Sequence, residues 1–265
     1  MKTKAHKYLT KIAIASSSLN LSKQDIKYIL KGTHHEDYYP LKTRATNWHF
    51  YRLEPNSPIP MKVKRFGIWC KPTSENIFQI HINHLKAPKS RKDYFKTLGK
   101  ILHHIQDMST PSHVVPIYHG PGKKDYYEKY MMKYLTKIQL ADTVQINSTP
   151  NNFNDLYHSA ASKTLNYLQD KSIEGISPDN ELVNISFDKI WTKYTPGNKM
   201  IEGFGKYGPY ANCFSIKRSR NSYVSRDGYR IKKTEIKKIY KELCDKAIQD
   251  SCDALIFALN SEELI

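Results

Sequence analysis

The stretch Leu98-Gly-Lys-Ile-Leu-His-His-Ile-Gln-Asp-Met-Ser-Thr-Pro-Ser-His113 combines a helical repeat with several potential metal ligands. Apolar residues recur at helical spacing over residues 91–107, which predicts an amphipathic helix. His103 and Asp107 lie four positions apart, so both project from one face of this helix, about 6 Å from each other. One divalent ion can bridge that spacing.

Pro111 is expected to end this helix and to turn the chain, so that His113 returns toward His103 and Asp107. A carboxylate at a helix C-terminus opposes the helix dipole. A cation beside Asp107 would remove that mismatch.

The rest of the chain is also predicted to be largely helical. Further helices are expected over residues 4–18, 22–31, 125–140, 153–170 and 232–259, with Ser22 as an N-cap and Gly32 as a stop. Residues 33–90 contain many prolines and a strand-like alternation at 78–82, and residues 178–228 are rich in Gly, Pro, Asn and Tyr. No linker divides the chain, so the expected fold class is all-α, with a single mainly helical domain over residues 1–265.

Charge and cysteine content indicate partner and redox state. Lys and Arg number 42 against 25 Asp and Glu, a net charge of +17, which favours an anionic ligand such as a phosphoester, a lipid surface or a nucleic acid. No apolar run approaches the roughly 18 residues of a membrane span.

Cys244 and Cys252, eight positions apart on one expected helix, lie about 12 Å apart along its axis, too far for a disulfide. Reduced thiols are expected.

The N-terminal apolar stretch Ile12-Ala-Ile-Ala15 is too short for a typical signal peptide. Lys2 has a bulky side chain, so we also expect Met1 to be retained. The expected location is the cytoplasm, or the outside of the cell by a non-classical or specialised secretion route.

The pattern His103-x3-Asp107-x3-Pro111-x-His113 resembles the core motif of the zinc-dependent phospholipase C and S1/P1 nuclease superfamily. These proteins are all-helical phosphodiesterases with three zinc ions. Other elements of the family occur in the same order, from residue 6 to about residue 170: His6 near the N-terminus, Asp37 in a Gly-x4-Asp segment, His49 in Trp48-His-Phe-Tyr51, and Glu128 on the next expected helix.

The resemblance implies two or three Zn²⁺ ions, and histidine nitrogens and carboxylate oxygens suit that ion. One ion would be held by Asp37, His49, His103 and Asp107. A second would be held by His113, Glu128 and one more group, and a third by His6 together with a bridging Asp107. The residue that matches Asp37 is also the proposed general base in the phospholipase branch.

The sequence departs from the family in two places. Lys124 stands where the family has a histidine four residues before the helical acid, and His119 or Asp125 could substitute for it. The family's N-terminal Trp, whose amine binds the third zinc, is absent, so the Met1 amine serves instead or that site is altered.

Other noticeable residues are expected to have structural roles. They are the histidines at 34, 35, 81, 84, 104 and 158, with His104 facing away from His103, the loop Phe204-Gly-Lys-Tyr-Gly208, and Trp48, although the loop and Trp48 could also line a substrate cleft.

Three functions are compatible with these observations. The favoured one is a phospholipase C that hydrolyses the glycerol–phosphate ester of phospholipids through metal-activated hydroxide, acting as a monomer with peripheral membrane contact. The alternatives are a single-strand nuclease, for which the basic charge and the tyrosines are suited, and a non-catalytic descendant that keeps the metal for structure.

Overall fold

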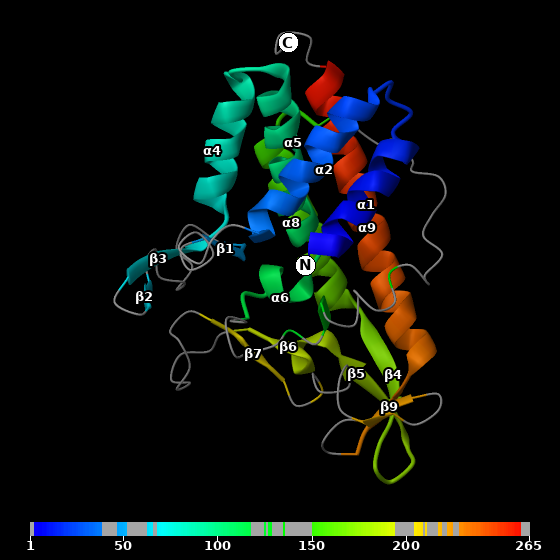
Figure 1. The fold of residues 1–265 in the computed structure, drawn as a ribbon. Coiled ribbons are helices and arrows are strands. Elements are labelled where there is room, and N and C mark those ends of the chain that lie inside the picture. Colours follow the sequence, from blue (N-terminus) through cyan, green and yellow to red (C-terminus); the bar gives the residue numbers. More distant parts are fainter. Residues whose placement is uncertain are drawn as a thin grey trace.

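A computed structural model describes residues 3–38, 47–51, 63–65, 68–117, 125, 127–128, 135, 150–193, 204–208, 210, 217–218, 222–224 and 228–260. These residues are mostly helical, as the sequence predicts, with small sheets added. The α-helices are α1 (Thr3–Ser16), α2 (Lys23–Tyr38), α4 (Glu75–Lys86), α5 (Arg91–Asp107), α6 (Pro111–Val114), α8 (Phe153–Asp170) and α9 (Lys233–Asn260). Helices α1, α2, α4 and α5 lie at one end of the molecule and most strands lie at the other, while α9 runs from the helical end down to the strands (Figure 1).

The strands form three small sheets. A three-stranded sheet has the order β1-β3-β2, in which β1 (Asn47–Phe50) is parallel and β2 (Val63–Arg65) antiparallel to β3 (Ile68–Thr73). A five-stranded antiparallel sheet has the order β5-β4-β10-β9-β8, from β4 (Ser172–Ile176), β5 (Leu182–Ser186), β8 (Lys217–Arg218), β9 (Ser222–Val224) and β10 (Arg230–Lys232). After the 3-10 helix η2 (Phe187–Lys189), β6 (Trp191–Thr192) pairs with β7 (Lys206–Tyr207). The stretch 178–228 therefore contains strands that its composition did not indicate.

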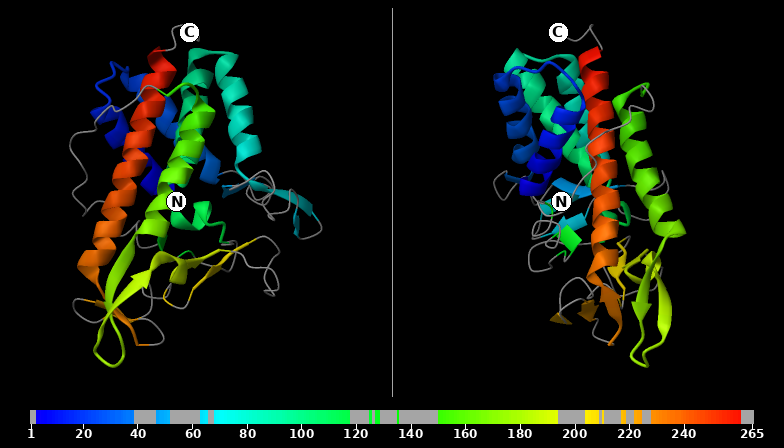
Figure 2. Two further views of the ribbon diagram at one scale, coloured as in Figure 1. Left: turned by 180° about the vertical axis from the view of Figure 1, so that it is seen from behind. Right: turned by 90° about the vertical axis from the view of Figure 1, so that its right-hand side faces the viewer.

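Helix α5 lies at the centre of the helical end and contacts α2, α4, α8 and α9, while α9 packs between α1 and α8 (Figure 2). Ser90 caps α5, because its side chain accepts a hydrogen bond from the Asp93 backbone N–H. Residues 101–107 of α5 are all buried. The His103–Asp107 pair thus projects into the protein interior.

Helix α2 continues past Gly32, so the expected stop at that residue is wrong. A Cβ on Gly32 would lie 1.9 Å from the Lys96 carbonyl oxygen of α5, and one on Gly99 would lie 2.0 Å from the Ile29 carbonyl oxygen of α2. Both glycines therefore allow two helices to cross at backbone contact. The added turns of α2 carry Glu36 and Asp37 toward the end of α5.

The expected strand at 78–82 is also wrong, because this segment belongs to helix α4. Phe78, His81, Ile82 and Leu85 are buried and occupy positions i, i+3, i+4 and i+7, which form one face of a helix. The alternation of Phe78, Ile80 and Ile82 suggested a strand, but Ile80 is exposed.

Two smaller expectations can also be compared with the structure. Ser22 does cap α2, since its side chain accepts the Asp25 backbone N–H at 3.1 Å, and Cys244 and Cys252 are free, buried thiols. Most of the helix expected at 125–140 lies outside the described residues. Across the described part of the chain, no helix combines the length and the apolar character that a membrane span requires.

Candidate metal centre

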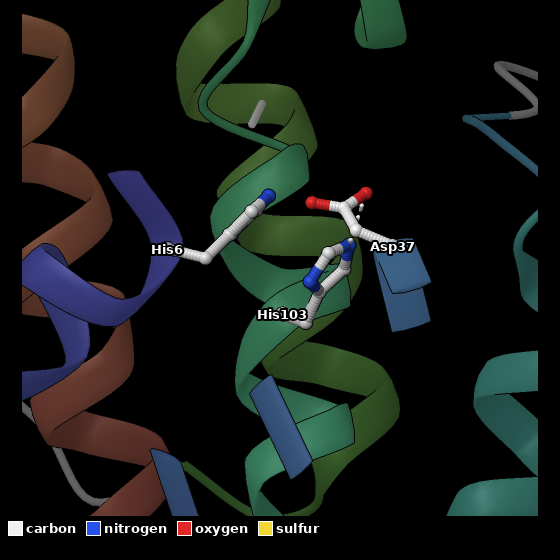
Figure 3. A group of neighbouring side chains, drawn as sticks. All are labelled: His6, Asp37 and His103. Atoms are coloured by element: carbon white, nitrogen blue, oxygen red, sulfur yellow. Dashed lines mark ion pairs between the residues drawn. The ribbon is translucent and has the colours of Figure 1, made fainter. Parts of the chain in front are cut away.

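Six of the residues predicted to be metal ligands come from five separate elements and meet beside the end of α5. His6 comes from α1, Asp37 from the last turn of α2, His49 from β1, His103 and Asp107 from α5, and His113 from α6. In Figure 3, His6, Asp37 and His103 point toward one another, and a ligand atom from each lies within 4.8 Å of the other two.

Asp107 is the common neighbour of the four histidines. Its Oδ1 lies 3.2 Å from His6 Nε2, and its Oδ2 lies 2.7 Å from His49 Nδ1. The same Oδ2 is 3.4 Å from His103 Nε2 and 3.7 Å from His113 Nδ1. The Asp107 side chain is fully buried, so its charge requires compensation from these neighbours or from a cation.

Two further carboxylates border this group. Asp37 Oδ1 lies 3.9 Å from His103 Nε2, and its Oδ2 accepts a hydrogen bond from the Thr3 hydroxyl at 2.9 Å. Glu128 Oε1 lies 3.0 Å from His113 Nε2. These two acids keep 13 % and 11 % of their side chains exposed, so the centre is open to solvent on the side where they lie.

The backbone sets the tautomer of two imidazoles. His103 Nδ1 lies 2.9 Å from the Thr33 carbonyl oxygen, and His113 Nδ1 lies 2.6 Å from the His49 carbonyl oxygen. A carbonyl oxygen only accepts hydrogen bonds, so each Nδ1 must carry the proton. In the neutral ring, Nε2 is then unprotonated, and in both residues it faces a carboxylate oxygen. His103 Nε2 also lies 3.1 Å from His49 Nδ1, which can donate to it.

A side-chain relay sets the tautomer of His6 in the same way. The Ser251 hydroxyl donates to the Ala247 carbonyl at 2.7 Å, so its oxygen accepts the Gln106 Nε2 at 3.1 Å. Gln106 Oε1 is therefore the acceptor for His6 Nδ1 at 2.9 Å. His6 Nε2, which makes no hydrogen bond among the described residues, is left facing Asp107.

The charge states follow from this crowding. Burial, helped by the neighbouring His103, lowers the pKa of His6 to about 4, which keeps this imidazole neutral. Burial also acts to lower the pKa of His103, but the carboxylates of Asp107 and Asp37 outweigh it and raise the pKa to about 9. Without a metal, a proton on His103 therefore balances part of the acidic charge.

Imidazole nitrogens and carboxylate oxygens that lie 2.7 to 3.9 Å apart in a largely buried cluster fit a bound cation. Four imidazoles with two or three carboxylates form the donor set that Zn²⁺ takes in proteins. Each Nδ1–H donated to a carbonyl or amide oxygen is the outer-shell contact that orients a ligating histidine.

His119 and Asp125 are the two residues that could replace the family's histidine at the position of Lys124, and the structure describes one of them, Asp125. Asp125 caps the helical residues that follow it, because its Oδ1 accepts the backbone N–H groups of Tyr127 and Glu128 at 2.7 and 3.2 Å. Its Oδ2 accepts the Ser112 hydroxyl. The two oxygens of Asp125 are thus both engaged. His119, Lys124 and the Met1 amine lie outside the described residues.

The aromatic loop packs beside the centre. Phe204 is buried and contacts Phe50 edge to face, with 5.2 Å between ring centroids. Burial and the charges of Asp125 and Glu128 raise the pKa of the Tyr207 phenol, which keeps its proton. Tyr207 belongs to the loop that the sequence analysis named as a possible lining of a substrate cleft, and it lies near Asp125 and Glu128. The side chain of Trp48 is outside the described part of the chain.

A second group of potential ligands was missed by the sequence analysis. Glu36, His81 and His104 place one ligand atom each within 4.8 Å of one another. His81 was assigned to a strand and Glu36 to a loop-rich region. His104 was placed on the expected helix over 91–107 but was expected to face away from His103. The spacing of Phe78, His81, Ile82 and Leu85 is the sequence feature that could have placed His81 on a buried helix face.

Comparison with protein-family models, with curated proteins and with solved structures finds no match for this chain. Function must therefore be argued from the site itself.

Proposed function

We propose that the chain is a zinc-dependent phosphodiesterase of the phospholipase C type, acting on the glycerol–phosphate ester of phospholipids. The fold expected with that function is the helical one of the phospholipase C and S1/P1 nuclease superfamily. The observation that carries the proposal is the shared orientation of His6, His103 and His113, whose protonated Nδ1 atoms face oxygen acceptors and whose Nε2 atoms face carboxylates.

Two groups of residues would hold the zinc ions in this proposal. Asp107 and the histidines around it would hold one or two zinc ions, and His113 with Glu128 would hold another. Bound zinc lowers the pKa of a water molecule and neutralises charge on a phosphoryl group.

Asp37 is suited to the role of general base. Its pKa is lowered: burial acts to raise it, but the charges of His103 and His6 outweigh burial, so the carboxylate stays ionised. It is also partly exposed, whereas Asp107 is fully buried. A water molecule approaching from solvent would therefore meet Asp37 and can pass a proton to it.

A basic pocket favours a second candidate function, hydrolysis of single-stranded nucleic acid. Lys7, Lys23, Lys27 and Lys31 line an open pocket between α1 and α2 together with His34. Asp37 follows His34 by three residues on α2. Phosphates of a nucleic acid strand are bound by such lysines in a salt-dependent way. A non-catalytic metal protein is the third reading, for which the altered position at Lys124 is the relevant observation.

One paired assay separates these functions. Purified full-length protein loaded with Zn²⁺ is incubated with phospholipid vesicles and, separately, with single-stranded DNA and RNA. Phospholipase C activity yields diacylglycerol and a phosphorylated head group, and a chelator abolishes it. Release of nucleotides with intact lipid supports the nuclease, and no turnover of either substrate by zinc-loaded protein contradicts both enzymes.

A further inference from the structure

Glu36, His81 and His104 form a cluster that lies outside the family-like motif. They come from three helices, α2, α4 and α5, and their side chains are 5 %, 7 % and 0 % exposed. Glu36 Oε2 lies 3.4 Å from His81 Nε2 and 3.5 Å from His104 Nε2. One carboxylate oxygen is therefore shared by two buried imidazoles.

The two rings lack the partners that buried imidazoles normally have. Among the described residues, neither nitrogen of His81 and neither nitrogen of His104 makes a hydrogen bond. Buried polar atoms that stay unsatisfied are costly, and native proteins rarely leave four of them together. A cation bound at the Nε2 atom of each ring would satisfy two of these four nitrogens, since a neutral imidazole offers one lone pair.

The separations match a tetrahedral metal site better than a hydrogen-bond network. With metal–ligand bonds of about 2.0–2.1 Å, the edge of a tetrahedron is about 3.3–3.4 Å. The measured 3.4 and 3.5 Å lie close to that edge and are longer than good N–H···O hydrogen bonds.

We infer that Glu36, His81 and His104 bind a second metal ion, with Zn²⁺ as the ion that best suits two imidazoles and one carboxylate. His104 also places a ligand atom within 4.8 Å of one from His49 and one from Asp107, so this ion would lie next to the first centre. Three protein ligands leave a fourth position for water. The ion would join α2, α4 and α5 at the end of the helical bundle where Asp37 and His103 also lie. It would thereby help to hold Asp37 and His103 in place, because Asp37 directly follows Glu36 and His103 directly precedes His104 in the sequence.

Lys100 is the charged group that competes for this position. Its ammonium lies 3.2 Å from Glu36 Oε1 and its side chain is 21 % exposed. The lysine contacts the other carboxylate oxygen, so Oε2 remains directed at the histidines. If the cluster were purely structural, Lys100 would help to balance the charge of Glu36, and His81 and His104 would only fill space.

The test counts bound metal. Bound metal is first removed from the full-length protein with a chelator. The protein is then reloaded with Zn²⁺ and freed of excess metal, and the number of zinc ions per chain is measured by elemental mass spectrometry. His81→Gln and Glu36→Gln are compared with the wild type, and His84→Gln is the matched control, since His84 is an exposed histidine of the same helix.

We expect His81→Gln and Glu36→Gln each to bind one zinc ion fewer than the wild type, and His84→Gln to bind the full number. Asp107→Asn should lose zinc from the first centre yet keep the ion that His81→Gln loses. This makes failure here distinguishable from failure of the proposed function. Wild-type stoichiometry in both Glu36→Gln and His81→Gln would overturn the inference.

A second measurement needs no substitution in the cluster. The imidazole ¹⁵N resonances of His81 and His104 are followed in the wild-type protein as Zn²⁺ is added. Coordination should shift one ring nitrogen of each residue at one equivalent per cluster. Rings that do not respond at saturating zinc contradict the site, even if the variants fail to fold.

Discussion

Gly32 of α2 and Gly99 of α5 lie so close that a Cβ on Gly32 would be 3.1 Å from the Gly99 Cα atom. This contact has a direct consequence for the metal centre. One residue beyond Gly32, the Thr33 carbonyl oxygen accepts His103 Nδ1 at 2.9 Å. The glycine crossing therefore sets both the spacing of the helices and the tautomer of a proposed ligand.

Gly99→Ala should destabilise the protein even though alanine favours helix formation. The added Cβ would lie 2.0 Å from the Ile29 carbonyl oxygen, so the helices must separate. We expect a loss of about 3 kcal/mol or more in the free energy of unfolding, the upper end for overpacking. Urea denaturation measures it, with the exposed Ser159→Ala on α8 as control, expected to change by less than about 0.5 kcal/mol. A stability equal to that of the wild type would show that the crossing is not tight.

Gln106 is expected to act as a positioning residue for His6. Gln106→Met keeps the length of the side chain but removes the amide oxygen that accepts a hydrogen bond from His6 Nδ1. Loss of such an outer-shell contact costs about 10–100-fold in metal affinity. Competitive Zn²⁺ titration measures the affinity, and ¹⁵N shifts of His6 report the tautomer. Gln169→Met, an exposed change on α8, should alter neither.

Part of the candidate metal centre could be predicted from local sequence spacing. Helical spacing joins His103 and Asp107, and Pro111 separates α5 from the short helix that carries His113. The approach of His6 and Asp37 followed from the family resemblance, since no periodicity relates residues so far apart. In the structure His6 lies beside Asp107 and Asp37 lies beside His103, while their roles as metal ligands remain predictions.

The missed features depend on tertiary contacts. Gly32 has the local character of a helix stop, but its actual use is to admit the backbone of α5. His81 lies in a segment whose alternation resembles a strand, and only packing against α5 selects the helix. Because α2 continues past Gly32 and residues 75–86 form helix α4, Glu36 lies beside His81 and His104. No single stretch of sequence indicates this contact.

Asp107→Asn tests the first centre directly. The neutral amide cannot balance a cation shared by His6, His49 and His103. We expect loss of at least one zinc ion and a fall in turnover of at least about 100-fold, since each zinc contributes several kcal/mol to transition-state stabilisation. Zinc analysis and the paired lipid and nucleic acid assay provide the readouts. Asp170→Asn, an exposed residue at the end of α8, is the charge-matched control and should keep both metal and activity.

The ion pair between Asp25 and Arg91 should make stability depend on pH. Arg91 Nε and Nη2 donate to Asp25 Oδ1 and Oδ2 at 3.0 and 2.8 Å, joining the start of α2 to the start of α5. Hydrogen bonding from Arg91 lowers the pKa of Asp25 below its usual value, although burial opposes this. The folded state therefore binds this proton less readily than the unfolded chain does.

The sign of the effect follows from that lowered pKa. The stabilisation by the pair is complete above the unfolded Asp pKa of about 3.9 and is lost as the pH falls through the lower folded value. Arg91→Ala should lower the Tm at pH 7, and the difference from the wild type should shrink as the pH falls below about 4. Thermal unfolding from pH 2.5 to 7 measures it. Lys92→Ala removes an exposed charge from the same turn and should show a small difference that does not vary in this way. A Tm difference for Arg91→Ala that stays constant down to pH 2.5 would mean that Asp25 is not the partner that matters.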